Sequence, residues 1–147
     1  MNFVLDTNAV SETEKPRPNP GLLDWLCVQD PAHLFVTTIT LAEVWHGFHR
    51  LEPNHSDYNR IKIIAMELPR TYRVLNFDLR AAAIWGEMTA AADGPLPLRD
   101  SFIAAIVRSR GHRIVTRASV DPFFCIKNRL VLFPFNCNYR SFITEGF

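Results

Sequence analysis

Short apolar segments alternate with longer stretches of helical character along this chain, and this alternation limits the folds that it can adopt. The apolar segments are rich in Val, Ile, Leu, Phe and Thr, which favour strands. They are short and mostly apolar, as expected for strands buried on both faces. We expect strands at residues 2–5, 33–39, 72–77, 113–116 and 130–133. Strands of this kind, separated by helices, predict an α/β fold whose parallel sheet is covered on both faces.

Capping residues and helix-breaking residues predict where the intervening helices begin and end. We expect helices over residues 22–28, from Thr40, over 56–68 before Pro69, from Asp78 to Gly94, and from Asp100 to Gly111. Thr40 and Glu43 have the spacing of a capping box, and so do Ser11 and Glu14. Three prolines within residues 15–21 predict an extended turn, because proline disfavours both helix interiors and central strands.

Four acidic residues follow predicted strands or stand at predicted helix starts, namely Asp6, Glu43, Asp100 and Asp121. In open parallel sheets these positions lie at the carboxyl edge, where ligands bind, so the four can converge there. Carboxylates that crowd together repel one another unless a cation compensates, and Mg²⁺ favours hard oxygen ligands. Such a site would suit metal-assisted hydrolysis of a phosphodiester.

Each acid also has a purely structural explanation. Glu43 could complete the capping box with Thr40, and Asp100 could stabilise a helix N-terminus. Asp121 precedes a proline and could simply start a turn. Asp6 is harder to explain in this way, because acids are depleted in strands and costly at their buried ends. From the residues alone, a shared metal site and separate structural roles both remain open.

The formal net charge of +1 conceals an uneven distribution of charge along the sequence. Residues 1–100 carry 9 basic and 13 acidic side chains, whereas residues 101–147 carry 7 and 2. Much of the basic excess comes from Arg108, Arg110, Arg113 and Arg117. These arginines could bind a polyanion, or they could form an ordinary solvated surface.

Composition and length restrict the remaining classes of protein. No apolar run approaches the roughly 20 residues of a membrane helix. Asp6 interrupts the apolar N-terminus, so we expect no export signal. The three cysteines, Cys27, Cys125 and Cys137, are odd in number and lack metal-type spacing, so we expect them to be small hydrophobic residues of a protein in the reducing cytoplasm. A chain of 147 residues is long enough for one domain, and we expect a single domain over 1–147.

Four short segments occur in an order and at a spacing found in a known family. They are DTNAVSE (6–12), LAEVWHGF (41–48), LPLRDSFIAAI (96–106) and IVTRASVDPF (114–123). Together they resemble PIN-domain proteins, and most closely the VapC/FitB type, which are toxins of toxin–antitoxin modules. The segment RVLNFD (73–78) also looks like this subfamily. The resemblance covers about residues 2–135 and leaves 136–147 as a C-terminal tail.

The resemblance implies a three-layer α/β/α sandwich with a central parallel sheet of four to five strands. It also implies an endoribonuclease that depends on Mg²⁺ or Mn²⁺. The family's catalytic acids fall on Asp6, Glu43, Asp100 and Asp121. Glu43 would join the other three, which would bind the metal, or would orient the attacking water. The family's supporting polar residues fall on Thr7, Asn8 and Thr116, which would hold the carboxylates or a metal-bound water.

The resemblance further implies an RNA substrate, a cognate antitoxin and a homodimer. Candidates to bind the RNA are Arg99, Arg108, Arg110, Arg113 and Arg117. Arg99, which directly precedes Asp100, could instead pair with an acid of the site. The alternative is a non-catalytic RNA- or protein-binding module, but such a module has no need for clustered negative charge. A phosphotransferase with a nucleophilic first-strand acid fits less well, because Asn8 stands where those enzymes usually have a second acid.

Overall fold

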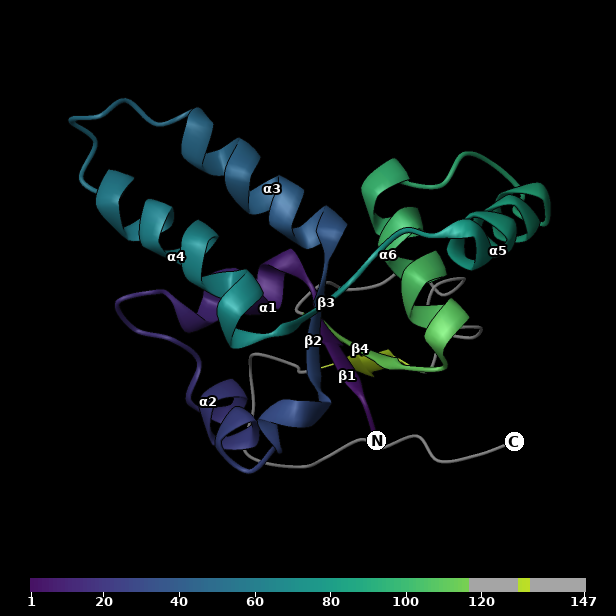
Figure 1. Ribbon diagram of the computed structural model, residues 1–147, viewed down its shortest axis with the longest axis horizontal. Coiled ribbons are helices and arrows are strands. Elements are labelled where there is room, and N and C mark those ends of the chain that lie inside the picture. The colour runs from purple at the N-terminus through teal and green to yellow at the C-terminus, as the bar shows by residue number, and fades with distance from the viewer. Residues whose placement is uncertain (117–129, 133–147) are drawn as a thin grey trace.

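The computed structural model describes residues 1–116 and 130–132, which form a five-stranded parallel sheet flanked by helices (Figure 1). The strands are β1 (Phe3–Leu5), β2 (Leu34–Thr37), β3 (Arg73–Leu75), β4 (Arg113–Thr116) and β5 (Leu130–Leu132). Their order across the sheet is β3-β2-β1-β4-β5, and all neighbouring pairs are parallel. The first strand of the chain therefore ends at the middle of the carboxyl edge.

Helices cover both faces of this sheet. They are α1 (Thr7–Thr13), α2 (Pro20–Cys27), α3 (Thr38–His49), α4 (Tyr58–Thr71), α5 (Leu79–Ala90) and α6 (Leu98–Arg110), with a 3-10 helix at Pro31–His33. Helices α1 to α4 lie on one side of the sheet, and α5 and α6 lie on the other (Figure 1). This arrangement confirms the three-layer α/β/α sandwich. No helix in the described part of the chain is both long and apolar enough to cross a membrane.

Alternate strand residues build the two apolar cores that hold the layers together. Val4 pairs with Ile114 and Leu5 with Val115 across β1 and β4, and all four are buried. Leu5 and Val115 belong to a cluster with residues of α1 to α4, whereas Val4 and Ile114 belong to a cluster with residues of α6. Because successive side chains point to opposite faces, both faces of each strand must be apolar. This requirement explains the continuous apolar runs in the sequence.

All five predicted strands are present. The prediction for residues 113–116 matches β4, and the others differ from the observed bounds by one or two residues. Two predicted helix boundaries are also confirmed. Asp78 caps α5 by accepting a hydrogen bond from the backbone N–H of Ala81 at 3.0 Å. Gly111 ends α6 with a φ of +64°, a left-handed conformation that favours glycine.

The predicted start of α3 is wrong by two residues, because a different threonine caps the helix. Thr37 is the N-cap, and its hydroxyl accepts a hydrogen bond from the backbone N–H of Thr40 at 3.0 Å. The helix therefore begins at Thr38, and the predicted capping box between Thr40 and Glu43 does not form. This change leaves the Glu43 carboxylate available for contacts outside its own helix.

Other helix boundaries also differ from those predicted. Asp6, not Ser11, caps the first helix, so the predicted capping box with Glu14 is wrong as well. Helix α4 continues through Pro69 and ends at Thr71, although proline cannot donate the helical hydrogen bond at that position. Five further bounds differ from those predicted by at most four residues: α2 begins at Pro20 and ends at Cys27, α4 begins at Tyr58, α5 ends at Ala90 and α6 begins at Leu98.

Candidate active site

Asp6 lies at the junction between β1 and α1 and contributes to both. Its backbone N–H donates to the carbonyl of Val115 at 3.1 Å, which continues the pairing between β1 and β4. Its Oδ1 atom accepts a hydrogen bond from the backbone N–H of Ala9 at 2.7 Å and thereby caps α1. Only 9% of the residue is exposed. Asp6 is thus a buried carboxyl group at the carboxyl edge of the central strand.

Burial raises the pKa of the Asp6 carboxyl above its ordinary value. Hydrogen bonds from Thr116, Ala9 and Asn8 act in the opposite direction, because they stabilise the charged form, but burial has the larger effect. Asn8 and Thr116, two of the predicted supporting residues, therefore contact Asp6. An ionised carboxylate at this position costs the fold some stability, which a cation or a proton can offset.

Glu43 connects α3 to two other helices through its carboxylate. Thr7, at the start of α1, donates a hydrogen bond from its Oγ1 atom to Glu43 Oε2. Arg99, at the start of α6, places its Nη1 atom 3.5 Å from Glu43 Oε1. Both carboxylate oxygens therefore contact side chains that lie far away in the sequence. The third supporting residue, Thr7, contacts Glu43 and not its sequence neighbour Asp6.

Asp100 lies in the first turn of α6 and is exposed to solvent. Partial desolvation raises the pKa of its carboxyl, and the nearby Glu43 carboxylate raises it further, whereas the Arg99 guanidinium lowers it. Because Asp100 is exposed, water screens these effects more strongly than it does at Asp6. Glu43 and Asp100 are nevertheless close enough to repel each other.

A hydrogen bond between two helices fixes the start of α6, and the sequence did not predict it. Trp85 of α5 donates from Nε1 to Ser101 Oγ at 2.9 Å, and Ser101 Oγ donates to the carbonyl of Leu98 at 2.8 Å. The helical spacing of apolar residues places Trp85 in the core but does not reveal this partner. A partly buried indole usually finds an acceptor for its N–H, so the signal that could have identified this contact is a buried hydroxyl, here that of Ser101, on a neighbouring helix. The contact holds the turn that carries Asp100.

The described acids of the predicted site come from three separate parts of the fold, and two observed interactions connect these parts. Thr7, adjacent to Asp6, contacts Glu43, and Glu43 in turn acts on Asp100. Within residues 1–116, however, no three His, Cys, Asp or Glu side chains already form a group that could hold a metal ion. The fourth predicted acid, Asp121, lies outside the described residues. The available donors are carboxylates and hydroxyls, and such donors fit a hard divalent cation.

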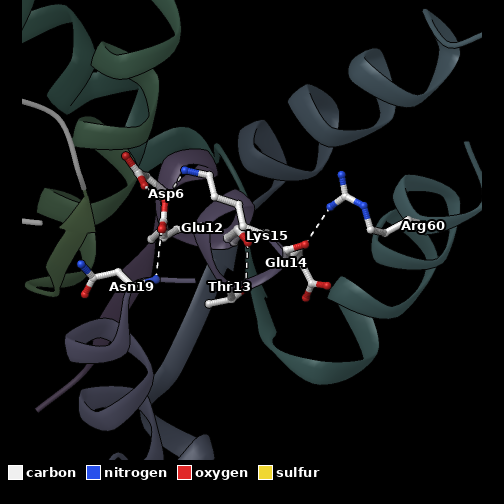
Figure 2. A network of polar contacts seen from close by, with 9 residues as sticks. Asp6, Glu12, Thr13, Glu14, Lys15, Asn19 and Arg60 are labelled. Atoms are coloured by element: carbon white, nitrogen blue, oxygen red, sulfur yellow. Dashed lines mark hydrogen bonds and ion pairs between the residues drawn. The ribbon is translucent and has the colours of Figure 1, made fainter. Parts of the chain in front are cut away.

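Glu12 is a further buried acid of α1, with 6% exposure, and its partners indicate a structural role (Figure 2). Its Oε2 atom lies 2.5 Å from Lys15 Nζ, and its Oε1 atom accepts a hydrogen bond from the backbone N–H of Asn19 at 3.1 Å. Asn19 in turn caps α2 by accepting a hydrogen bond from Leu22 N at 3.1 Å. Glu12 therefore ties the end of α1 to the proline-rich segment and to α2.

The predicted RNA-binding arginines divide between the two edges of the sheet. Arg99 lies at the start of α6, beside the acids. Arg108 and Arg110 lie at the other end of α6, where each forms an ion pair with an acid of α5 or its N-cap, at 2.9 and 2.5 Å respectively. Arg113 begins β4 at the amino edge. Arg117 lies outside the described residues. Of the four that the structure describes, Arg99 is the one at the same edge as Asp6.

Comparison with sequence families gives a match over most of the chain. The family described as PIN domain matches residues 3–118. The match begins at the first residue of β1 and continues past the last residue of β4. It therefore includes Asp6, Glu43 and Asp100.

Two relatives align along most of their own length and most of this chain. The plasmid stability protein StbB of Pseudomonas syringae pv. tomato is 34% identical over 82% of this chain and 90% of the relative. The VapC ribonuclease Y4jK of Sinorhizobium fredii is 32% identical over 82% of this chain and 89% of the relative. Each alignment therefore covers well over two thirds of both chains.

The crystal structure of FitAcB from Neisseria gonorrhoeae has the same fold. It aligns with a TM-score of 0.73 at 24% identity and covers 90% of this chain and 97% of that chain. At this level of identity the likeness concerns the backbone architecture. It shows that the α/β/α arrangement found here also occurs in an experimentally solved protein.

The raised pKa of Asp6 predicts a specific dependence of stability on pH. Because the carboxyl binds its proton more tightly in the folded state, stability falls as pH rises from the ordinary carboxyl value through the folded value. Asp6→Asn should therefore raise the melting temperature of the metal-free protein at pH 7 by a few degrees. The amide keeps the oxygen that caps α1. The gain should shrink below about pH 4, where an aspartate is itself protonated.

Thermal unfolding followed by circular dichroism, in the presence of a chelator, measures this effect. Asp24→Asn is the matched control, because Asp24 is exposed on α2 and its substitution changes the net charge equally. A melting temperature for Asp6→Asn at or below that of Asp24→Asn would show that the buried carboxylate does not strain the fold.

Proposed function

Because this chain belongs to the PIN-domain family, we propose that it is a metal-dependent endoribonuclease that acts as the toxin of a toxin–antitoxin pair. A relative named VapC ribonuclease supports RNA as the substrate. One observation supports the catalytic part of the proposal: Thr7, which directly follows the buried Asp6, donates a hydrogen bond to Glu43, and the Glu43 carboxylate raises the pKa of Asp100. The pKa values of Asp6 and Asp100 are both raised, and perturbed acids at the carboxyl edge of a parallel sheet are a frequent mark of catalytic sites.

In this proposal the acids hold a divalent cation. Asp6 and Asp100 would bind it together with Asp121, and Glu43 would join them or orient the attacking water. Mg²⁺ or Mn²⁺, when bound, would polarise the scissile phosphate and lower the pKa of a water molecule. The all-oxygen donor set supports these ions over softer metals such as copper.

The polar residues around the acids would position them for this task. Hydrogen bonds from Thr116 and Asn8 favour the ionised form of Asp6, which is the form that binds a cation. Thr7 restricts the rotation of the Glu43 side chain by occupying one of its oxygens. Loss of such supporting contacts typically weakens metal binding or activity by about 10–100-fold.

A binding module without catalysis is the alternative. It would bind RNA in a salt-dependent manner and would need no metal. The arrangement of charge argues against it, because acids beside the binding surface repel phosphates when no cation lies between them. An assay of RNA cleavage with and without a divalent metal separates the two functions.

We predict that the purified protein cleaves structured RNA when Mg²⁺ or Mn²⁺ is present and that EDTA abolishes cleavage. Asp6→Asn and Asp100→Asn should each lower the cleavage rate by roughly 100-fold or more. Loss of an indirect metal contact already costs up to about 100-fold, and these acids would bind the metal directly. Gel analysis of end-labelled transfer and ribosomal RNA measures the rate. Asp24→Asn serves as the control and should cleave like the unmodified protein.

Cleavage that persists in both Asp6→Asn and Asp100→Asn would remove the proposed mechanism. RNA binding without any cleavage in either metal would favour the non-catalytic module instead.

The proposal extends to a protein partner. Solved structures with this fold include complexes described as toxin–antitoxin systems. We infer that a cognate antitoxin binds this chain, that the chain forms a homodimer, and that both act in the cytoplasm. Asp100 is exposed at the edge of the fold and Glu43 is partly exposed, so a basic segment of the partner could cover them.

The product of the neighbouring gene should form a stable complex with this chain and suppress RNA cleavage. Size-exclusion chromatography with light scattering measures the complex and the oligomeric state of the chain alone. Finding neither a complex nor any loss of cleavage would contradict the assignment as a toxin.

A further inference from the structure

Arg99 occupies one oxygen of Glu43 in the protein without substrate. Thr7 donates to Oε2 of that carboxylate, while Arg99 Nη1 lies 3.5 Å from Oε1. The Glu43 side chain is 19% exposed, whereas that of Arg99 is 64% exposed. The partly buried carboxylate of Glu43 therefore contacts the guanidinium of Arg99, which is exposed to solvent.

This ion pair is weak enough to open easily. Its separation is at the long limit of a hydrogen bond, and exposed ion pairs contribute little to folding stability. The pairs made by Arg60, Arg70 and Arg108 are shorter, at 2.9 Å each. Arg99 is therefore held less firmly than these other arginines of the described part of the chain.

The position of Arg99 is also distinctive. Helix α6 begins at the carboxyl edge and ends at Arg110 near the amino edge, so Arg99 and Arg108 are about 14 Å apart along its axis. Among the ion pairs in the described part of the chain, the one between Arg99 and Glu43 is the one that includes a predicted catalytic acid. It also neighbours Asp100, which it stabilises in the charged form.

We propose that Arg99 is a substrate-positioning residue, which neutralises Glu43 in the free protein and moves to an RNA phosphate when substrate binds. This inference rests on the proposed ribonuclease function. A guanidinium binds phosphate with two parallel hydrogen bonds and is more weakly hydrated than an ammonium group, so the exchange of partner is favourable. Departure of Arg99 frees Glu43 Oε1 at the moment when the substrate arrives.

The first test measures RNA binding without metal, so that cleavage plays no part. Fluorescence anisotropy of a labelled RNA stem–loop in EDTA is followed over a range of salt concentrations. Arg99→Gln should weaken binding roughly 10-fold. It should also reduce the magnitude of the slope of log K against log salt by about 1, which corresponds to the loss of one phosphate contact. Arg99→Lys should keep the slope but recover only part of the affinity, because it keeps the charge and loses the bidentate geometry.

Arg70→Gln is the matched control for this measurement. Arg70 is 70% exposed and forms an ion pair with Glu67 on α4, at the end of the helix that leads into the amino end of β3. Its loss should leave affinity and slope unchanged. Equal behaviour of Arg99→Gln and Arg70→Gln would overturn the inference, as would a loss of thermal stability in Arg99→Gln without any change in slope.

The second test uses Mn²⁺ alone, without RNA. Removing the guanidinium from beside Glu43 and Asp100 should raise the affinity for Mn²⁺ several-fold in Arg99→Gln, because a competing positive charge is lost. Unchanged or weaker Mn²⁺ binding in that variant would overturn the inference. Failure of the ribonuclease proposal is distinguishable, since it appears as absence of cleavage by the unmodified protein in Mg²⁺.

Discussion

Repulsion between carboxylates at one edge of the sheet is the constraint on which the candidate site depends. A parallel sheet returns each crossover to the same edge, so Asp6 after β1, Glu43 on the helix after β2 and Asp100 at the start of α6 belong to elements that meet there, although they are far apart in the sequence. The fold tolerates their charge through a few specific donors, among which Thr7 and Arg99 contact Glu43. Such an arrangement is stable enough to fold but remains short of positive charge, which is the condition that favours a divalent cation.

Hydrogen bonds outside the site fix the helices that carry its acids. Thr37 fixes the start of α3, and the hydrogen bond between Trp85 and Ser101 fixes the start of α6. Glu12 joins α1 to the segment that follows it. These contacts involve buried or partly buried polar groups, which are costly to leave unpaired, whereas the ion pair of the exposed Arg99 contributes little to stability. The helix starts that carry the acids are therefore held more firmly than the Arg99 side chain.

Much of the fold could be predicted from the sequence, because continuous apolar runs identify buried strands and alternating helices imply a parallel sheet. The strand at residues 113–116 and the glycine that ends α6 followed directly from local rules. The start of α3 could not, because Thr37 and Thr40 satisfy the same capping rule and tertiary packing selects between them. The resemblance implied that Thr7 holds a carboxylate, but it did not say that this is Glu43, which lies 36 residues away and is brought to Thr7 only by the folded chain. The roles of the individual acids remain predictions, and Asp121 lies outside the described residues.

The most direct test of the central claim is a double-mutant cycle on Mn²⁺ affinity, measured by electron paramagnetic resonance of the free ion. If Asp6 and Asp100 share one cation, Asp6→Asn and Asp100→Asn should each weaken binding at least about 10-fold, and the double variant should lose less than the product of the two. Affinities that stay unchanged, or losses that simply multiply, would show that the two carboxylates act separately and that no shared cation site exists.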